Sequence, residues 1–180
     1  MSDQLRKLNV LFRRRGLTAV ASSAMPLPKT SMTVFEVRAL DDANDGVSEP
    51  CALLFIAPGA LGKADIIRIL AFASSVNHVI VYSNAVSLQA MQILDAEHGD
   101  RFCEVLNYKD IVFDKPLNVL VPTYKVLNSV EIKDIERRRA TTVDKFPIML
   151  RSDAMARVFG FRPGDVVLAV ETGCYRIVVR

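Results

Sequence analysis

The sequence has 180 residues, of which 51% are hydrophobic, and a formal net charge of +3. This length suits one ordinary domain or two small ones, and the hydrophobic content excludes an intrinsically disordered chain. No apolar run reaches the ~18–20 residues that span a bilayer, and the first residues lack the apolar core of a secretory signal, so we expect an intracellular protein with no membrane partner. Residues 1–109 carry 11 Lys/Arg against 11 Asp/Glu and residues 110–180 carry 12 against 9, which is too weakly basic for an autonomous DNA-binding domain.

Helices and strands alternate in the first part of the chain. A helix is predicted over residues 3–15, with Ser2 as its cap and Gly16 as its stop, and the Ser/Pro-rich residues 22–31 are predicted to form a loop. The pattern then predicts, in chain order, strand 32–40, loop 41–50, strand 51–57, helix 60–75, strand 78–83, helix 87–99 (capped by Ser87, stopped by Gly99) and strand 102–106. Strand, helix and strand at this spacing imply a right-handed crossover and a small α/β layer.

Beyond residue 110 the pattern changes to short elements, which indicates a second, α+β module. Asn128 with Glu131 three residues later is typical of a capping box, and Asp134 and Arg138 have the favourable i,i+4 order. The predicted elements are strand 118–121, helix 128–139, helix 152–159 and strands 166–171 and 174–179, the last two joined by Thr172-Gly173. We therefore expect an α+β protein with an N-terminal module, 1–109, and a C-terminal module, 110–180.

The stretch "RSDAMARVFGFRPGDVV" (151–167) contains glycines that could belong to a phosphate loop or to a corner of the fold. Ser152 is predicted to cap a short helix and Gly160 to end it in the left-handed conformation. Arg162–Asp165 fits a type II turn, in which Gly164 takes a positive φ. A phosphate loop runs from strand to helix, whereas this corner runs from helix to strand, so we interpret it as a structural corner.

Residues that would carry catalysis are missing from the expected positions. In "APGALGKAD" (57–65) the glycine spacing and Ala64 do not match the Walker pattern. The two histidines, His78 and His98, have no motif partner, and the three scattered cysteines do not form a zinc pattern. The buried strands 51–57 and 78–83 hold no carboxylates for a two-metal nuclease centre. We expect no enzyme activity, no cofactor, no metal and no small-molecule substrate.

The C-terminal module resembles a known family in several separated motifs. These are "LVP" (120–122), a charged helix, "FP" (146–147), "RSDAMARVFGFRPGDVV" (151–167) and "YRIVV" (175–179), in this order. They resemble the fifth subunit shared by eukaryotic nuclear RNA polymerases, whose C-terminal half is similar to a small subunit of the archaeal RNA polymerase. "FRRRG" (12–16), "CALLFIAP" (51–58) and "HVIVYSNAVSLQAM" (78–91) resemble the eukaryotic N-terminal extension more weakly.

The resemblance implies a non-catalytic polymerase subunit in the nucleus, or in the nucleolus if it serves RNA polymerase I. Its N-terminal jaw, with a nuclease-like fold but no catalytic carboxylates, would lie beside downstream DNA, and its C-terminal assembly module would dock on the largest subunit among the other polymerase subunits. The implied assembly residues are Leu120, Val121, Pro122, Arg151, Asp153, Arg157, Gly160, Arg162, Gly164, Asp165, Tyr175 and Arg176. The implied DNA-proximal residues are Asn84, Ser87, Gln89, Arg13, Arg14 and Arg15, whose contacts would be to phosphate and independent of sequence.

Several positions depart from the family pattern and indicate a divergent paralogue. The two histidines that flank the family's "LVP" are replaced by Asn118 and Tyr124, a common arginine by Ile148, and a common proline by Ala154. The loop before the last jaw helix commonly reads Thr-Pro-Ser-Ala, whereas residues 87–90 read Ser-Leu-Gln-Ala. Two alternatives remain: a sequence-specific DNA-binding regulator of the swapped-hairpin type, which uses a corner similar to "VFGFRPGDVV", and a nuclease of the fold that the jaw resembles.

Overall fold

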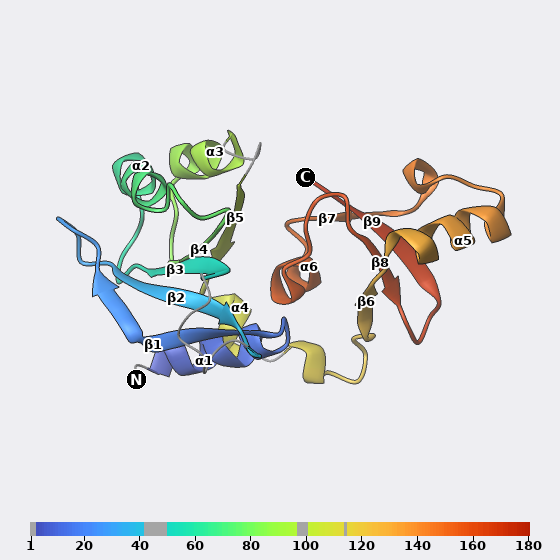
Figure 1. Ribbon diagram of the computed structural model, residues 1–180, viewed down its shortest axis with the longest axis horizontal. Coiled ribbons are helices and arrows are strands. Elements are labelled where there is room, and N and C mark those ends of the chain that lie inside the picture. Colours follow the sequence, from blue (N-terminus) through green and yellow to red (C-terminus); the bar gives the residue numbers. More distant parts are fainter. Residues whose placement is uncertain (1–2, 42–49, 97–100, 114) are drawn as a thin grey trace. The chain divides into compact units, whose positions relative to one another are not determined.

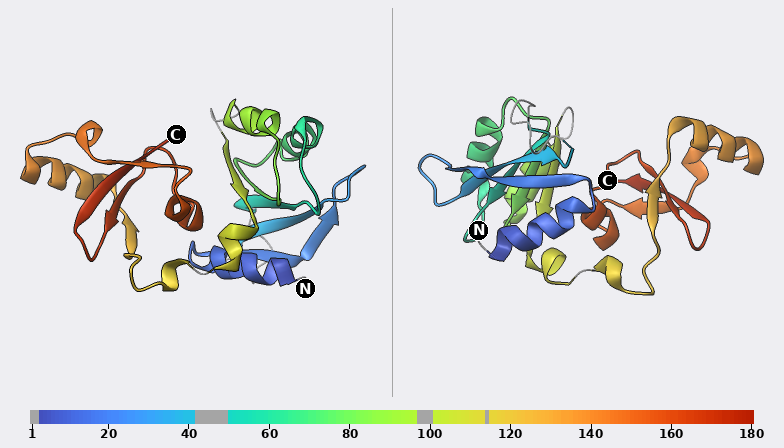
Figure 2. Two further views of the ribbon diagram at one scale, coloured as in Figure 1. Left: turned by 180° about the vertical axis from the view of Figure 1, so that it is seen from behind. Right: turned by 60° about the horizontal axis from the view of Figure 1, so that its bottom comes forward.

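The chain forms two compact units, Met1–Val112 and Phe113–Arg180, in a computed structural model that describes residues 3–41, 50–96, 101–113 and 115–180 (Figures 1 and 2). Each unit has its own sheet and its own apolar clusters, and the fold is α+β as expected. The sequence pattern had placed the boundary three residues earlier. Among the described helices, none combines the length and the apolar character needed to cross a bilayer.

The N-terminal unit is built on a five-stranded sheet in which the strands follow one another in chain order. The strands are β1 (Leu17–Pro26), β2 (Thr33–Ala39), β3 (Ala52–Ile56), β4 (His78–Tyr82) and β5 (Phe102–Leu106). β1, β2 and β3 pair antiparallel, whereas β3, β4 and β5 pair parallel, which confirms the predicted α/β layer. The loop predicted over residues 22–31 is wrong, because β1 continues to Pro26. Hydrogen bonds to β2, with a register shift between Val20 and Met25, hold this segment as a strand, although its small and polar residues do not predict one.

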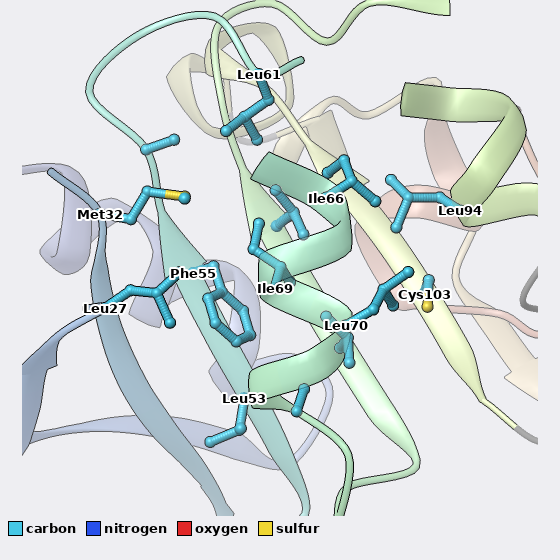
Figure 3. Packing of buried hydrophobic residues seen from close by; sticks show 14 of the residues in the cluster. Leu27, Met32, Leu53, Phe55, Leu61, Ile66, Ile69, Leu70, Leu94 and Cys103 are labelled. Carbon is cyan, nitrogen blue, oxygen red and sulfur yellow. The ribbon is translucent and has the colours of Figure 1, made fainter. Parts of the chain in front are cut away.

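Helices cover both faces of this sheet. α2 (Lys63–Phe72) and α3 (Leu88–Ala96) lie on one face, where Ile69 lies on the side of Phe55 of β3 and Ile66 faces Leu94 of α3 (Figure 3). α1 (Asp3–Arg13) and the unpredicted helix α4 (Tyr108–Val112) lie on the other face, packed over β3 and β4 through the cluster that contains Leu8 and Phe12 (Figure 1). All five residues of β3 and of β4 are therefore buried, as the continuous apolar runs predicted.

Local signals mark the helix ends of this unit. The Ser87 hydroxyl accepts a hydrogen bond from the Ala90 amide at 3.2 Å, which confirms the predicted cap of α3, and Gly16 has a φ of +69° beyond α1. The cap predicted at Ser2, the stop at Gly99 and most of the predicted loop 41–50 lie outside the described residues.

The C-terminal unit has a four-stranded sheet in the order β6-β8-β9-β7. α6 (Ala154–Phe159) packs on one face, over Met149, Val167 and Val178, and α5 (Ser129–Arg139) packs on the other, over Val166 and Leu168. The strands are β6 (Tyr124–Val126), β7 (Ile148–Leu150), β8 (Val166–Ala169) and β9 (Cys174–Val179), and short 3₁₀ turns lie at Lys115–Leu117 and Val143–Lys145.

Three expectations for this unit are corrected by the structure. The strand predicted at 118–121 is wrong: the Leu120 amide bonds to the Asn118 side chain at 2.9 Å and the chain turns there. β7 was not predicted, because three residues flanked by a proline carry too little periodicity. The cap of α6 is Asp153, which accepts from the Met155 amide at 2.7 Å, and not Ser152. The capping box at Asn128 is confirmed.

Candidate functional site

The helix-to-strand corner of the C-terminal unit is closed by its own backbone. Gly160 ends α6 with a φ of +69°, and the Phe161 amide bonds to the Ala156 carbonyl at 3.0 Å. Gly164 has a φ of +96° and the Asp165 amide bonds to the Arg162 carbonyl at 3.0 Å, which confirms the predicted turn.

The same corner is fastened to β9 within one chain. The Gly164 amide donates to the Val178 carbonyl at 2.9 Å, and the Val178 amide donates to the Asp165 carbonyl at 2.8 Å. The Asp165 carboxylate accepts from the Arg162 amide at 2.7 Å. These amides are used internally, so the corner does not form a phosphate cradle.

Three aromatic rings, which no sequence pattern marks as a group, fix α6 on the sheet. Phe159 and Phe161 stack at 5.4 Å with an interplanar angle of 9°, and the ring of Tyr124 in β6 lies 5.9 and 6.0 Å from them. Tyr124 stands at a position where the resembling family has a histidine. In the sequence, only the two phenylalanines on either side of Gly160 indicate an aromatic group. That Tyr124 of β6 packs against them is visible only once the sheet is formed.

The predicted assembly residues fall into three groups in the structure. Leu120, Val121 and Pro122 precede Thr123, whose amide and hydroxyl bond to the Glu171 carboxylate at 2.7 and 2.6 Å and so tie the segment to the far end of the β8–β9 hairpin. The second group lies on and beyond α6 and consists of Arg151, Asp153, Arg157, Gly160, Arg162, Gly164 and Asp165.

The third group, Tyr175 and Arg176, is divided between the two faces of the sheet. Tyr175 belongs to the α5 face, where its ring stacks on Phe146 at 5.9 Å and lies 5.3 Å from the guanidinium carbon of Arg139. Arg176 is paired in register with Val167, which places it on the α6 face, and it is exposed. Tyr175 therefore has a packing role within the unit, whereas Arg176 shares a face with the α6 group.

An exposed apolar segment precedes this unit's sheet. The side chains of Leu117, Val119 and Leu120 are 73%, 99% and 89% exposed, and they belong to neither apolar cluster of the unit. Such a run of exposed apolar residues is typical of a protein interaction surface. Two hydrogen bonds to Asn118, one from the Leu120 amide to its side chain and one from the Val121 amide to its carbonyl, give the segment a defined turn.

The loops at the carboxyl ends of the parallel strands are joined to one another. The Leu61 amide donates to the Ala85 carbonyl at 2.9 Å and the Ser87 amide to the Leu61 carbonyl at 3.0 Å, across the crevice where open α/β sheets bind ligands. At the start of α2 the Gly62 amide donates to the Asp65 carboxylate at 3.0 Å, so a carboxylate of the chain itself occupies the anion position. This geometry disfavours nucleotide binding.

The predicted DNA-proximal residues are not equivalent in the structure. Asn84, Ser87 and Gln89 are exposed around the start of α3, and Arg13 and Arg14 are exposed at the end of α1. The Arg15 side chain, in contrast, is only 4% exposed and forms an ion pair with Glu104 at 2.9 Å. The geometry gives Arg15 a structural role.

Glu104 also contacts His78 of β4, with 2.5 Å between Nε2 and Oε1. Burial opposes ionisation of this carboxyl, but the charge of Arg15 and the hydrogen bonds from His78 and Arg15 outweigh it and hold the pKa at about 2. The side chains of His78 and Glu104 are 10% and 6% exposed, so they anchor β5 to β4 instead of facing a ligand. Among the described residues, His, Cys, Asp and Glu form no group of three that could hold a metal.

Comparison with known families identifies the C-terminal unit. Residues 114–173 match the family model described as RNA polymerase Rpb5, C-terminal domain. The match covers 60 of the 180 residues, all of them in the C-terminal unit. The last strand of that unit, β9, follows the matched residues. No curated protein matches the chain at a significant level.

Proposed function

We propose that this chain, whose Rpb5 C-terminal domain makes it an Rpb5-like RNA polymerase subunit, is non-catalytic and has two separate tasks. The C-terminal unit docks on the largest subunit, and the N-terminal unit forms part of the jaw beside downstream DNA. A nuclear location follows from this role, or a nucleolar one if the chain serves RNA polymerase I.

The observation that carries the docking proposal is the exposed apolar segment at residues 117–121. Leu120, at 89% exposure, is the most exposed of the predicted assembly residues that are apolar, and burying it against a partner is favourable by about 2 kcal/mol. Two exposed arginines lie near α6: Arg162 follows the helix in the sequence, and Arg176 lies on the sheet face that α6 covers. Arginine is enriched in protein interfaces. We assign Leu120–Pro122 and the α6 group to the surface that faces the largest subunit.

The jaw proposal rests on exposed polar and basic residues of the N-terminal unit. Asn84, Ser87 and Gln89 surround the start of a helix, where backbone amides favour phosphate oxygens, and Arg13 and Arg14 supply positive charge. Contacts of this kind are independent of base sequence and weaken steeply with salt. The closed crevice beside them supports a binding role over a nuclease or nucleotide-dependent one.

Purification of the tagged chain from its own cells tests the docking proposal. We expect the large polymerase subunits to co-purify with the wild-type chain, to be lost with Leu120→Asp, and to be retained with Val130→Asp, which changes a side chain of α5 that is 75% exposed. Recovery of the wild-type chain alone would overturn the proposed function. Full retention with Leu120→Asp would overturn only the assignment of residues 120–122.

Photo-crosslinking in the assembled polymerase tests the jaw proposal. A crosslinker at Asn84 should reach downstream DNA whatever its sequence, whereas one at Val130 in the C-terminal unit should not. Absence of crosslinks from Asn84, Ser87 and Gln89 in active complexes would contradict the jaw assignment.

A further inference from the structure

The turn that follows α5 places a half-buried threonine, Thr141, behind a run of three arginines, Arg137–Arg139 (Figure 1). We propose that the Thr141 hydroxyl is a phosphorylation site for a protein kinase that recognises arginines before the acceptor. This modification lies outside the two tasks assigned above, and the inference depends only on the C-terminal unit.

The order of the residues fits a kinase that reads basic charge. Arg138 and Arg139 stand three and two residues before Thr141, and no other serine or threonine in the sequence has basic residues at both of these positions. Arginine forms paired, charge-assisted hydrogen bonds with carboxylates, and kinases select their substrates in part by charge pattern. A kinase whose substrate groove carries carboxylates at these two positions therefore favours Thr141 over the other hydroxyls of the chain.

The hydroxyl of Thr141 is available for the reaction. The Thr141 amide donates to the Glu136 carbonyl at 3.1 Å, but its hydroxyl forms no hydrogen bond within the part of the chain that the structure describes. The next residue differs, because the Thr142 hydroxyl donates to the Asp144 carboxylate. The structure therefore favours Thr141 over its neighbour as the phosphate acceptor.

The arginines make only surface contacts within the unit. Arg137 and Arg138 share the carboxylate of Asp134, and their side chains are 82% and 69% exposed. The guanidinium carbon of Arg139 lies 5.3 Å from the centre of the Tyr175 ring, and Arg139 is also exposed. Exposed ion pairs and cation–π contacts contribute little to stability, so a kinase can exchange them for its own carboxylates at small cost.

The last turn of α5 can open to enter a kinase groove in an extended conformation. Ile135 is the last buried residue of the helix, and residues 137–140 are exposed. Ala140 has a φ of +46°, which is unfavourable for a residue with a β-carbon, and its amide lies 3.5 Å from the Arg137 carbonyl. Opening this turn therefore removes little packing, while the buried Ile135 and Phe146 hold the segment at both ends.

The reaction replaces a neutral hydroxyl with a strongly charged group. The Thr141 hydroxyl oxygen attacks the γ-phosphorus of ATP, the bond from that phosphorus to the bridging oxygen breaks, ADP leaves, and the hydroxyl proton passes to the base of the kinase. The new group carries a charge of about −1.5 to −2 at pH 7. Residues 133–145 contain five Lys/Arg and three Asp/Glu, so the modification cancels most or all of the net positive charge of this segment.

The first test uses the full-length chain, labelled ATP and the catalytic subunit of cAMP-dependent protein kinase as the arginine-reading probe. We expect about one phosphate per chain, located at Thr141 by tandem mass spectrometry and lost with Thr141→Val. Thr172, an exposed threonine with no basic residue among the three before it, is the internal control and should stay unlabelled.

Variants of basic residues test whether the arginines direct the kinase. Arg138→Gln with Arg139→Gln should lower kcat/KM for the labelling by about tenfold or more. Lys63→Gln with Arg68→Gln removes the same charge from exposed positions of α2 and should react as the wild type does. Equal rates for the two double variants, no labelling, or labelling mainly at another residue would each overturn the proposal.

The second test examines the chain purified from its own cells in the presence of phosphatase inhibitors. Mass spectrometry should find phosphate on Thr141, and phosphatase treatment should remove it. A chain without phosphate at Thr141, from growing and from starved cells alike, would overturn the proposal. Neither test measures binding to the large polymerase subunits, so the outcome is independent of the co-purification test.

Discussion

The guanidinium of Arg15 and the carboxylate of Glu104 form a two-pronged ion pair inside the N-terminal unit, with N···O distances of 2.9 Å on both arms. The pair joins the residue just before Gly16, beyond α1, to the central residue of β5, 89 positions later in the chain. Its side chains are 4% and 6% exposed, so neither charge can return to water while the unit is folded. The stability of the N-terminal unit therefore depends on both partners being present.

Removing the acid of this pair should destabilise the N-terminal unit strongly. Glu104→Gln removes the carboxylate charge that faces the buried side chains of Arg15 and His78, and we expect a loss of about 3–5 kcal/mol in the free energy of unfolding, measured by urea denaturation. Asp3→Asn, which removes the exposed partner of Lys7 in the same unit, is the control and should change the stability very little. Equal effects of the two substitutions would show that the buried pair is energetically unimportant.

The same pair predicts how the stability depends on pH. The pKa of Glu104 is lowered from 4.5 to about 2, because Arg15 and His78 outweigh the cost of its burial. The folded state therefore holds this proton less tightly than the unfolded state does. The resulting stabilisation is fully present above about pH 4.5 and is lost as the pH falls through about 2. Urea unfolding from pH 6 downward should show the gap between wild type and Glu104→Gln closing over that interval, and a constant gap would contradict the prediction.

A side chain at Gly164 should strain the backbone at the corner of the C-terminal unit. Its φ is +96°, and a β-carbon built there meets no atom within 4 Å, so we expect Gly164→Val to cost about 1–3 kcal/mol because of its backbone conformation. Gly59 also has open space around it but has no positive φ, so Gly59→Val is the matched control. An unchanged melting temperature for Gly164→Val would mean that the turn is assigned incorrectly.

The capping box of α5 makes a separate, smaller contribution. The Asn128 side chain accepts from the Val130 and Glu131 amides at 3.0 and 2.9 Å, while the Glu131 carboxylate accepts from the Asn128 amide at 2.9 Å. Asn128→Ala should cost about 1 kcal/mol in chemical denaturation, because it leaves helix amides without their acceptor. Ser129→Ala, one residue later, keeps the cap and should have a much smaller effect.

Features set by a few neighbouring residues were predictable from the sequence. Gly160 and Gly164 mark positive φ values, Asn128 and Glu131 cap each other within one turn, and the continuous apolar runs of β3 and β4 indicate strands buried on both faces. The same local motifs, taken in order, indicated the family that the match to residues 114–173 then supported. These signals are reliable because the interactions they describe close within a few residues.

Features that depend on distant partners were decided by the tertiary structure. β1 continues through a stretch predicted to be a loop because β2 supplies its hydrogen bonds, and the strand expected at 118–121 is a turn because no strand pairs with it. The sequence does not distinguish Arg15 from Arg13 and Arg14, and only its ion pair with the distant Glu104 shows that Arg15 is buried. The exposure of Ile148 and Leu150 likewise depends on the order of the sheet, because β7 pairs with β9 on one side only. Pairing and burial between residues far apart in the chain leave no periodicity in the local sequence. The sequence by itself therefore determined the corners and the helix caps. The assembled sheets determined which side chains are buried and which remain exposed to a partner.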